Sequence, residues 1–204
     1  MSGKKLANKS WKPAVSVVVL ALLWEAVALA QWFPPYLFPG PRKVAMALVA
    51  DWPVLWGHTV STAGIAATGF AVGCAVGLAV AFFLHLVPFF RSAVYPLLVL
   101  SQNVPIVVLA PLLVVWFGFG FMPKLILLTI VCFFPVAIAT LDGLSRADPN
   151  MAGYMRMAGA GAWQTFCKLE LPWSLPSVFS GMKVSATYSV LAAVVAEWMG
   201  ASKG

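Results

Sequence analysis

Charged residues are scarce in this sequence. Of its 204 residues, 62% are hydrophobic and only 9% are Asp, Glu, Lys or Arg, whereas soluble domains carry about 25% charged residues. This shortage excludes a soluble globular domain and indicates an integral membrane protein. The 13 basic residues outnumber the 6 acidic ones, but they are scattered near the ends of apolar runs and form no basic patch. We therefore expect membrane lipid as a partner and no nucleic acid.

Residue patterns that would support catalysis, metal binding or ATP binding are also missing. The three cysteines, Cys74, Cys132 and Cys167, lack the spacing of metal ligands, so we infer no metal site and no disulfide. His58 and His85 have no clear carboxylate or cysteine companion, and we interpret both as interfacial residues. The phosphate-loop pattern G-x-x-x-x-G-K-[ST] does not occur. We expect no catalytic residue and no cofactor in this chain, so any ATP-driven step needs a partner subunit.

Long apolar runs are what the sequence has in abundance. Apolar runs of roughly 18 or more residues predict transmembrane helices, and they occur at 14–30, 59–87, 94–117, 124–141 and 175–198. These five candidate spans predict an all-α, polytopic transmembrane bundle. Residues 1–13 form a short N-terminal segment ahead of it.

The distribution of lysine predicts the orientation of these spans. Four lysines precede the first run: Lys4, Lys5, Lys9 and Lys12. Because positive residues accumulate on the inner side, we expect a cytoplasmic N-terminus, and alternation then places loop 142–174 inside as well. A lysine-rich start followed by an apolar run and Ala28-Leu29-Ala30 also fits a cleavable signal peptide, although Glu25 within the run argues against that interpretation.

Proline and glycine positions predict how two of the spans pack. Three prolines interrupt the third run: Pro96, Pro105 and Pro111. Because a proline removes a helical hydrogen bond, we expect this span to be kinked and to lie inside the bundle. The second run has glycines at four-residue spacing: Gly69, Gly73 and Gly77. This stripe predicts the close approach of another helix.

The loop between the fourth and fifth runs contains the signals of two short helices. Asp148 and Pro149 are typical of a helix start, and Gly159 is typical of a helix stop. A second helix is predicted over 162–169, ending before Leu171-Pro172 because the residue ahead of a proline is driven out of helical geometry. From these residues alone, the loop is either an interfacial segment or a docking surface for another protein.

Several residues of this loop carry a family resemblance. Gly159-Ala160, Trp163, Phe166, Leu171-Pro172 and the following Leu175-Pro176 resemble the coupling motif of inner-membrane permease subunits of bacterial ABC importers. The match departs at its start, where Gly153-Tyr154-Met155 replace Glu-Ala-Ala. The resemblance implies that the following residues contact the ATPase: Pro149, Gly153, Arg156, Gly159, Ala160, Trp163, Phe166, Leu171 and Pro172.

The resemblance continues over nearly the whole chain. Segments 101–105, 110–112, 116–120, 133–135 and 193–198 are similar to the branch that transports nitrate, sulfonates, taurine and thiamine precursors. Within it, 132–135, 140–144 and 186–190 most resemble permeases for the pyrimidine precursor of thiamine; sulfonate, taurine, nitrate or riboflavin permeases are the alternatives. The resemblance implies a type I importer fold, cytoplasmic ATPase subunits, a periplasmic or lipid-anchored solute-binding protein and a second permease copy, as a homodimer in the bacterial inner membrane.

Prolines and polar residues within the spans are candidates for a translocation path. Charged groups in a bilayer are costly and therefore often functional. The candidates are Pro105, Pro111, Lys183, Thr187 and Glu197. Alternatively, Lys183 and Glu197 simply extend to the lipid headgroups. A membrane scaffold without a path, and an ion-coupled carrier, are the alternative functions.

The family usually has at least six spans, whereas five are predicted here. We therefore expect the transmembrane domain, 14–204, to lack a last helix. In that case the small residues of the fifth span would face lipid or an empty groove. These residues are Gly181, Ser185, Ser189 and Ala192.

Overall fold

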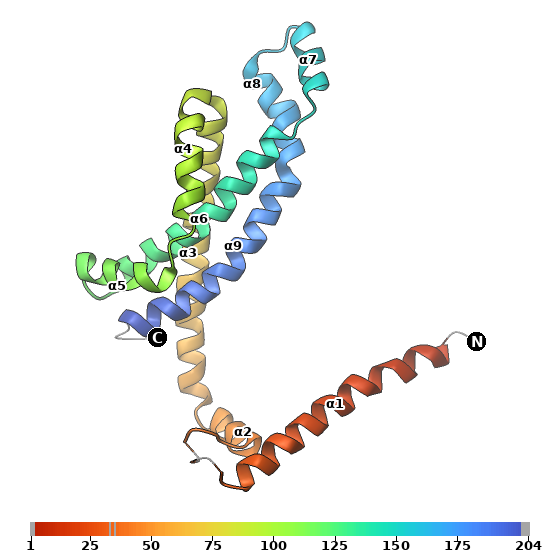
Figure 1. Cartoon of the computed structure of the whole chain (residues 1–204), viewed down its shortest axis with the longest axis vertical. Helices are drawn as coiled ribbons and strands as arrows, with labels where there is room; N and C mark the ends of the chain where they lie inside the picture. The colour runs from red at the N-terminus through yellow and green to blue at the C-terminus, as the bar shows by residue number, and fades with distance from the viewer. Residues whose placement is uncertain (1–2, 33, 35, 201–204) are drawn as a thin grey trace. The chain divides into compact units, whose positions relative to one another are not determined.

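The computed structural model describes residues 3–32, 34 and 36–200, and all regular elements in these ranges are helical (Figure 1). They are α1 (Gly3–Leu29), α2 (Pro41–Ala50), α3 (Trp52–Leu86), α4 (Pro88–Ser101), α5 (Ile106–Phe117), α6 (Phe121–Ser145), α7 (Pro149–Met157), α8 (Ala162–Thr165), the π-helical turn η1 (Phe166–Glu170) and α9 (Leu171–Gly200). One compact unit ends at Gly57 and a second begins at His58. The predicted all-α class is confirmed.

In the first unit, the side chain of Glu25 joins α1 to the start of α2. Its Oε2 atom accepts a hydrogen bond from the backbone N–H of Arg42, at 3.3 Å. An acidic group at a helix N-terminus is favoured because the free N–H groups there carry partial positive charge. Gly40 lies buried beside it, and a Cβ atom at this position would come within 2.9 Å of Glu25 Oε2. The acidic residue in the first apolar run therefore has a local structural partner.

Among the described residues, three helices are long and apolar enough to cross a membrane, or four if α4 and α5 count as one broken span. The three are α3, α6 and the continuous helix Ala162–Met199, which comprises α8, η1 and most of α9. The first predicted run corresponds to Pro13–Leu29 in α1, which is at the lower limit of the roughly 17–25 residues that span a bilayer. Five spans were predicted, whereas three or four of the described helices meet the length and composition of a span; each predicted run still lies largely on helix.

The third run differs from its prediction, because it is broken into two helices. α4 and α5 are bent by 100° relative to each other. Pro105 lacks an N–H group and disfavours helical geometry at Val104, while Asn103 Nδ2 donates to the carbonyl of Val99 at 2.9 Å and satisfies the end of α4. Leu100 and Val115 are also exposed. The run is therefore neither a single kinked helix nor enclosed within this chain.

Small residues bring α6 and α9 close together, and the two helices run side by side (Figure 1). A Cβ atom at Gly181 would lie 2.8 Å from the Pro135 carbonyl oxygen, and one at Gly143 would lie 2.7 Å from Ser177 Cβ. Ser185 Oγ donates to the Cys132 carbonyl at 2.7 Å. Such close contacts are typical of membrane helix interfaces.

This interface corrects the expected lipid exposure of the fifth span. Ser185, Ser189 and Ala192 are buried, and Gly181 lies directly against α6. The expectation was wrong because α6 already occupies the side of α9 that these small residues form.

The glycine stripe of α3 makes the predicted close approach, and its partner is α6. A Cβ atom at Gly69 would overlap with Leu128 Cβ, and one at Gly73 would lie 2.5 Å from Cys132 Cβ. At Gly77 it would lie 2.9 Å from the Phe133 carbonyl oxygen. Only glycine therefore permits this helix separation at all three positions.

Candidate functional site

The segment between α6 and α9, residues 146–170, is built on a capped helix; we call it the α7–α8 segment. Asp148 Oδ1 accepts a hydrogen bond from the Asn150 N–H at 2.8 Å, and Pro149 occupies the first turn. At the other end, Gly159 has φ 84°, and the Ala160 N–H donates to the Met155 carbonyl at 2.9 Å. This arrangement is a Schellman motif, in which a left-handed residue closes a helix. The predicted start and stop signals are confirmed.

The second half of the α7–α8 segment departs from its prediction. α8 begins after Gly161, whose N–H donates to Gln164 Oε1 at 3.2 Å. The helix does not end before Leu171-Pro172, because α8 continues through η1 into α9. Within η1 the Leu171 N–H donates to the Phe166 carbonyl, which is the wider π-type spacing. Such a π-bulge makes room for Pro172 without ending the helix.

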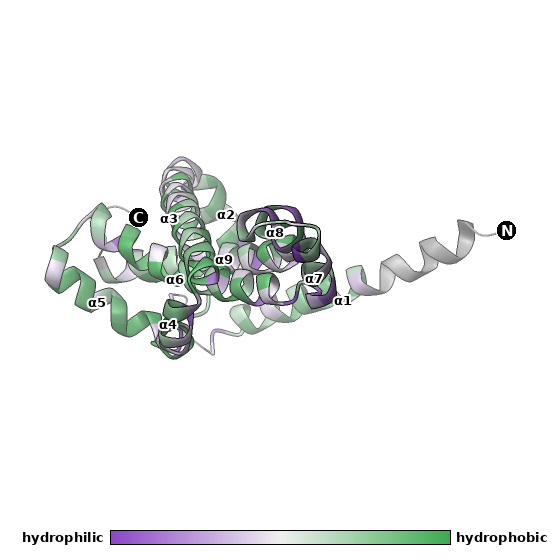
Figure 2. Ribbon diagram, turned by 90° about the horizontal axis from the view of Figure 1, so that it is seen from above, coloured by the Kyte–Doolittle hydropathy of each residue, from purple (hydrophilic) through white to green (hydrophobic). Residues whose placement is uncertain are grey.

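The outer side of α7 presents apolar side chains on a hydrophilic segment. Figure 2 shows hydrophilic colouring around α7 and α8. Tyr154 is 64% exposed and Met157 is 77% exposed. Together with the exposed Met151 they recur every three residues, so they lie on one side of the helix. Arg156 is exposed nearby. Exposed apolar side chains with a basic neighbour are suited to contact with another protein.

Phe166 connects the α7–α8 segment to α3. Its buried ring meets the Phe82 ring edge-on, with centroids 5.6 Å apart. On another side it stacks with Trp163, at a centroid distance of 5.5 Å. Contacts of this kind add to the burial of aromatic surface. A displacement of α8 would therefore also displace the end of α3, on which Phe166 packs.

A hydrogen-bonded pair makes a second connection between the same two elements. His85 Nε2, in the last turn of α3, lies 2.7 Å from Glu170 Oε2 in η1. The sequence interpretation of His85 as a residue without a carboxylate companion is therefore wrong. The two residues are 85 positions apart, so no local pattern indicated the contact.

A cavity of about 450 Å³ lies at the break between α4 and α5. It is lined by residues of the end of α4, the break, α5, α6 and α9: Ser101, Gln102, Asn103, Val104, Pro105, Ile106, Leu109, Ile130, Val131, Phe134, Pro135 and Tyr188. None of these residues is charged. The volume falls within the range of about 300–1,000 Å³ that is typical of small-molecule sites.

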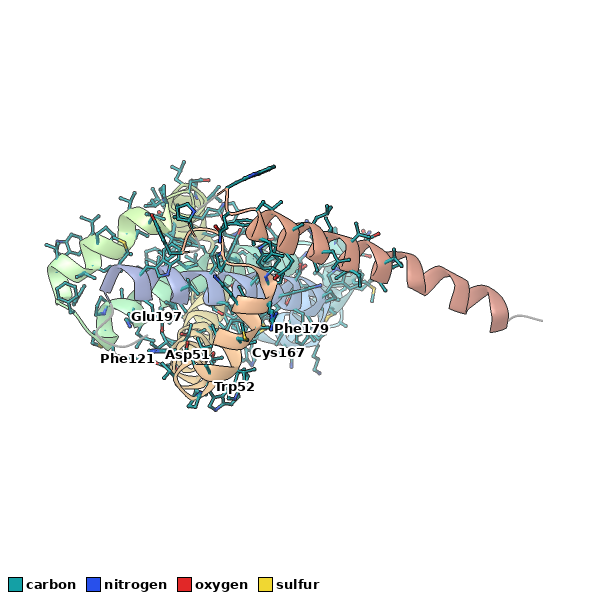
Figure 3. All side chains as sticks on the ribbon, turned by 90° about the horizontal axis from the view of Figure 1, so that it is seen from below. Asp51, Trp52, Phe121, Cys167, Phe179 and Glu197 are labelled. Atoms are coloured by element: carbon teal, nitrogen blue, oxygen red, sulfur yellow. The ribbon has the colours of Figure 1, made fainter. Side chains whose placement is uncertain are left out.

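Of the predicted path residues, only Pro105 lines this cavity. Pro111 lies within α5, and Lys183 and Thr187 are exposed on α9. Glu197, labelled in Figure 3, accepts hydrogen bonds from Thr62 Oγ1 at 2.8 and 3.0 Å and so joins α9 to α3. The five candidates do not come together at one site.

The polar and aromatic residues of the cavity were not among the predicted path residues. Gln102, Asn103, Phe134 and Tyr188 all line it. Each of the four lies in a segment that carries the family resemblance. None of them stands out as a single polar residue within an apolar run, which is the pattern that marked the polar residues of the predicted path. The sequence signal for this cavity was the interruption of the third run by Pro105, because non-helical backbone in a membrane must be buried in protein or border an aqueous cavity.

Comparisons with known proteins agree on one family. A family model described as "Binding-protein-dependent transport system inner membrane component" matches residues 69–204. A "Probable ABC transporter permease protein" of Haemophilus influenzae is 34% identical, covering 95% of this chain and 79% of the relative. The "Formylaminopyrimidine transport permease protein ThiX" of Halalkalibacterium halodurans is 30% identical, covering 98% and 80%. The "Taurine transport system permease protein TauC" of Escherichia coli is 26% identical, covering 93% and 71%.

A solved structure is similar in fold. The crystal structure of an amino acid ABC transporter with histidines matches with a TM-score of 0.60 and 16% sequence identity. The match covers 74% of this chain and 75% of the other. At this identity the similarity shows the fold alone.

Proposed function

The chain belongs to the inner membrane components of binding-protein-dependent transport systems. We propose that its α7–α8 segment binds a partner ATPase subunit and transmits the conformational change that ATP hydrolysis drives there. As an ABC importer permease it is a multi-pass membrane protein that works with an ATPase and a solute-binding protein. The ATP itself is bound and hydrolysed by the partner. The observation that carries the proposal is the capped α7 with its exposed apolar side.

The contacts of the α7–α8 segment supply a route for the motion. Phe166 packs on Phe82, and Glu170 pairs with His85; both contacts lead to α3. The helix is continuous from α8 through η1 into α9, so the same displacement also reaches α9. Because packed helices adopt discrete arrangements, ATPase closure would switch the bundle between outward- and inward-facing states.

The resemblance-derived coupling residues have separate roles in this proposal. Pro149 and Gly159 define the ends of α7, and Arg156 lies on its exposed surface. Trp163 and Phe166 stack on each other. Pro172 lies just after the π-helical turn η1, which keeps the helix continuous from α8 into α9. A Cβ atom added at Gly153 would have no neighbouring atom within 4 Å, while Ala160 and Leu171 contribute the backbone hydrogen bonds described above.

We further propose that the solute is the pyrimidine precursor of thiamine. The proposal is supported by the 30% identical relative that is described as a formylaminopyrimidine permease. Relatives described as riboflavin, aliphatic sulfonate and taurine permeases are the competing choices. A second copy of this chain would complete the path as a homodimer, and the N-terminus would be cytoplasmic.

A charge on the exposed side of α7 tests the docking role. Met157→Glu should strongly reduce co-purification of the ATPase and abolish solute-stimulated ATP hydrolysis, while membrane insertion remains normal. Met46→Glu is the matched control, because Met46 is also an exposed methionine but lies on α2. Equal ATPase recovery with both variants would contradict the role of the α7–α8 segment.

A further inference from the structure

The geometry points to a solute-binding site within the permease itself, at the cavity of the α4–α5 break. We propose that this site selects uncharged, flat solutes with hydrogen-bonding groups and rejects anions such as sulfonates. The inference rests on the proposed importer function and adds a selection step beyond the solute-binding protein.

The break creates polar groups in an otherwise apolar region. Residues 102–105 leave the helix, and non-helical backbone at membrane depth is tolerated where it is buried or borders an aqueous cavity. Two side chains of this region are already engaged: Asn103 Nδ2 donates to the Val99 carbonyl at 2.9 Å, and Ser101 Oγ donates to the Leu97 carbonyl at 2.7 Å. These two side chains stabilise the end of α4.

Two other polar side chains of the cavity remain available for a solute. Within the part of the chain that the structure describes, the side-chain amide of Gln102 and the hydroxyl of Tyr188 make no hydrogen bond. The amide has both a donor and an acceptor group, and the phenol can act as either. They come from different elements, the break and α9, and both border the same space. A solute with several ring nitrogens or amino groups can bond to both.

An aromatic ring favours a flat solute at this position. Phe134 lines the cavity, and its ring is held edge-on by Phe133 at a centroid distance of 4.9 Å and an interplanar angle of 61°. Pro105, Ile106 and Val131 complete an apolar wall. A planar heteroaromatic ring would stack on Phe134 or meet its edge, as aromatic pairs do.

The absence of charge among the lining residues disfavours the competing class of solute. A sulfonate entering the site would lose its hydration without gaining an Arg or Lys partner, which is costly. The two lysines nearest in sequence to lining residues, Lys124 and Lys183, do not line the cavity. A neutral solute does not incur this cost. The lining therefore distinguishes neutral solutes from anions, although it offers few hydrogen-bonding groups.

Equilibrium binding to the assembled transporter tests the inference. The permease and its ATPase are placed in nanodiscs without the solute-binding protein, and binding of radiolabelled formylaminopyrimidine is measured with taurine as competitor. We expect saturable binding that unlabelled formylaminopyrimidine displaces and equimolar taurine does not. Tyr188→Phe and Gln102→Leu should each weaken binding by about three- to tenfold, because each removes one hydrogen bond.

Tyr36→Phe provides the matched control, since it removes the same hydroxyl from an exposed tyrosine outside the cavity. Its binding should equal that of the unaltered chain. Thermal unfolding and basal ATP hydrolysis of each variant report whether the complex is intact. An intact complex that binds taurine equally well, binds no solute, or is unaffected by both cavity variants overturns the inference alone. Failure of the permease to assemble with any ATPase overturns the proposed function, and the inference with it.

Discussion

At the scale of single residues, the end of α7 depends on Gly159. Its φ of 84° lies in the left-handed region, where residues with a Cβ atom are disfavoured by about 1–2 kcal/mol. A Cβ atom added at this position would have no neighbouring atom within 4 Å. The requirement for glycine is therefore conformational and does not arise from crowding.

Gly159→Val should destabilise the end of α7 and weaken ATPase docking. We expect faster proteolysis or hydrogen exchange over residues 149–165 and less co-purified ATPase, at an unchanged level of inserted protein. Gly161→Val is the control, because Gly161 has φ −72° and is equally uncrowded. If the two variants behave alike, backbone conformation at Gly159 is not what orients the segment.

At the scale of elements, the contact of α3 with α6 depends on the glycine stripe. A side chain at Gly73 would meet Cys132 Cβ at 2.5 Å and the Thr129 carbonyl oxygen at 3.0 Å. Because one of these atoms belongs to the backbone, the helices themselves must move to admit even a methyl group. Gly64 lies in the same helix with no atom within 4 Å of an added Cβ.

The two glycines provide a test of this packing. Gly73→Ala should lower stability in detergent, since overpacking costs about 1–3 kcal/mol. Gly64→Ala should leave it unchanged or raise it by up to about 1 kcal/mol, because alanine favours the helix more than glycine does. Thermal unfolding of the purified permease measures both. A stabilising Gly73→Ala would contradict the close α3–α6 contact.

At the scale of the whole molecule, orientation in the membrane decides which face meets the ATPase. Cys167 is the partly exposed cysteine of the chain, since Cys74 and Cys132 are buried. It lies in η1, next to the proposed docking surface. Its accessibility therefore reports the side on which the α7–α8 segment lies.

A membrane-impermeant thiol reagent should label Cys167 in inside-out vesicles but not in intact cells. The expected difference follows from the basic residues that precede the first apolar run, which favour a cytoplasmic N-terminus. Cys167→Ser should remove the labelling and so assign it. Labelling of intact cells would reverse the proposed orientation.

Features that depend on neighbouring residues were accessible from the sequence. Asp148, Pro149 and Gly159 marked both ends of α7, because capping and left-handed closure involve only a few adjacent residues. A close helix contact was predicted from Gly69, Gly73 and Gly77, since their spacing places them on one side of a helix. The apolar runs indicated the membrane and the helical class, because a bilayer leaves few alternatives for the backbone.

Tertiary structure alone decided which distant residues meet. Glu197 pairs with Thr62 across 135 positions, and His85 pairs with Glu170 across 85; neither partner could be chosen from local patterns. The break at Pro105 becomes a cavity only because α6 and α9 supply Phe134 and Tyr188. The sequence by itself determined a helical membrane permease with a capped α7, since local sterics and hydropathy act over short distances. The arrangement of its site was decided by packing between helices, which depends on all contacting surfaces together.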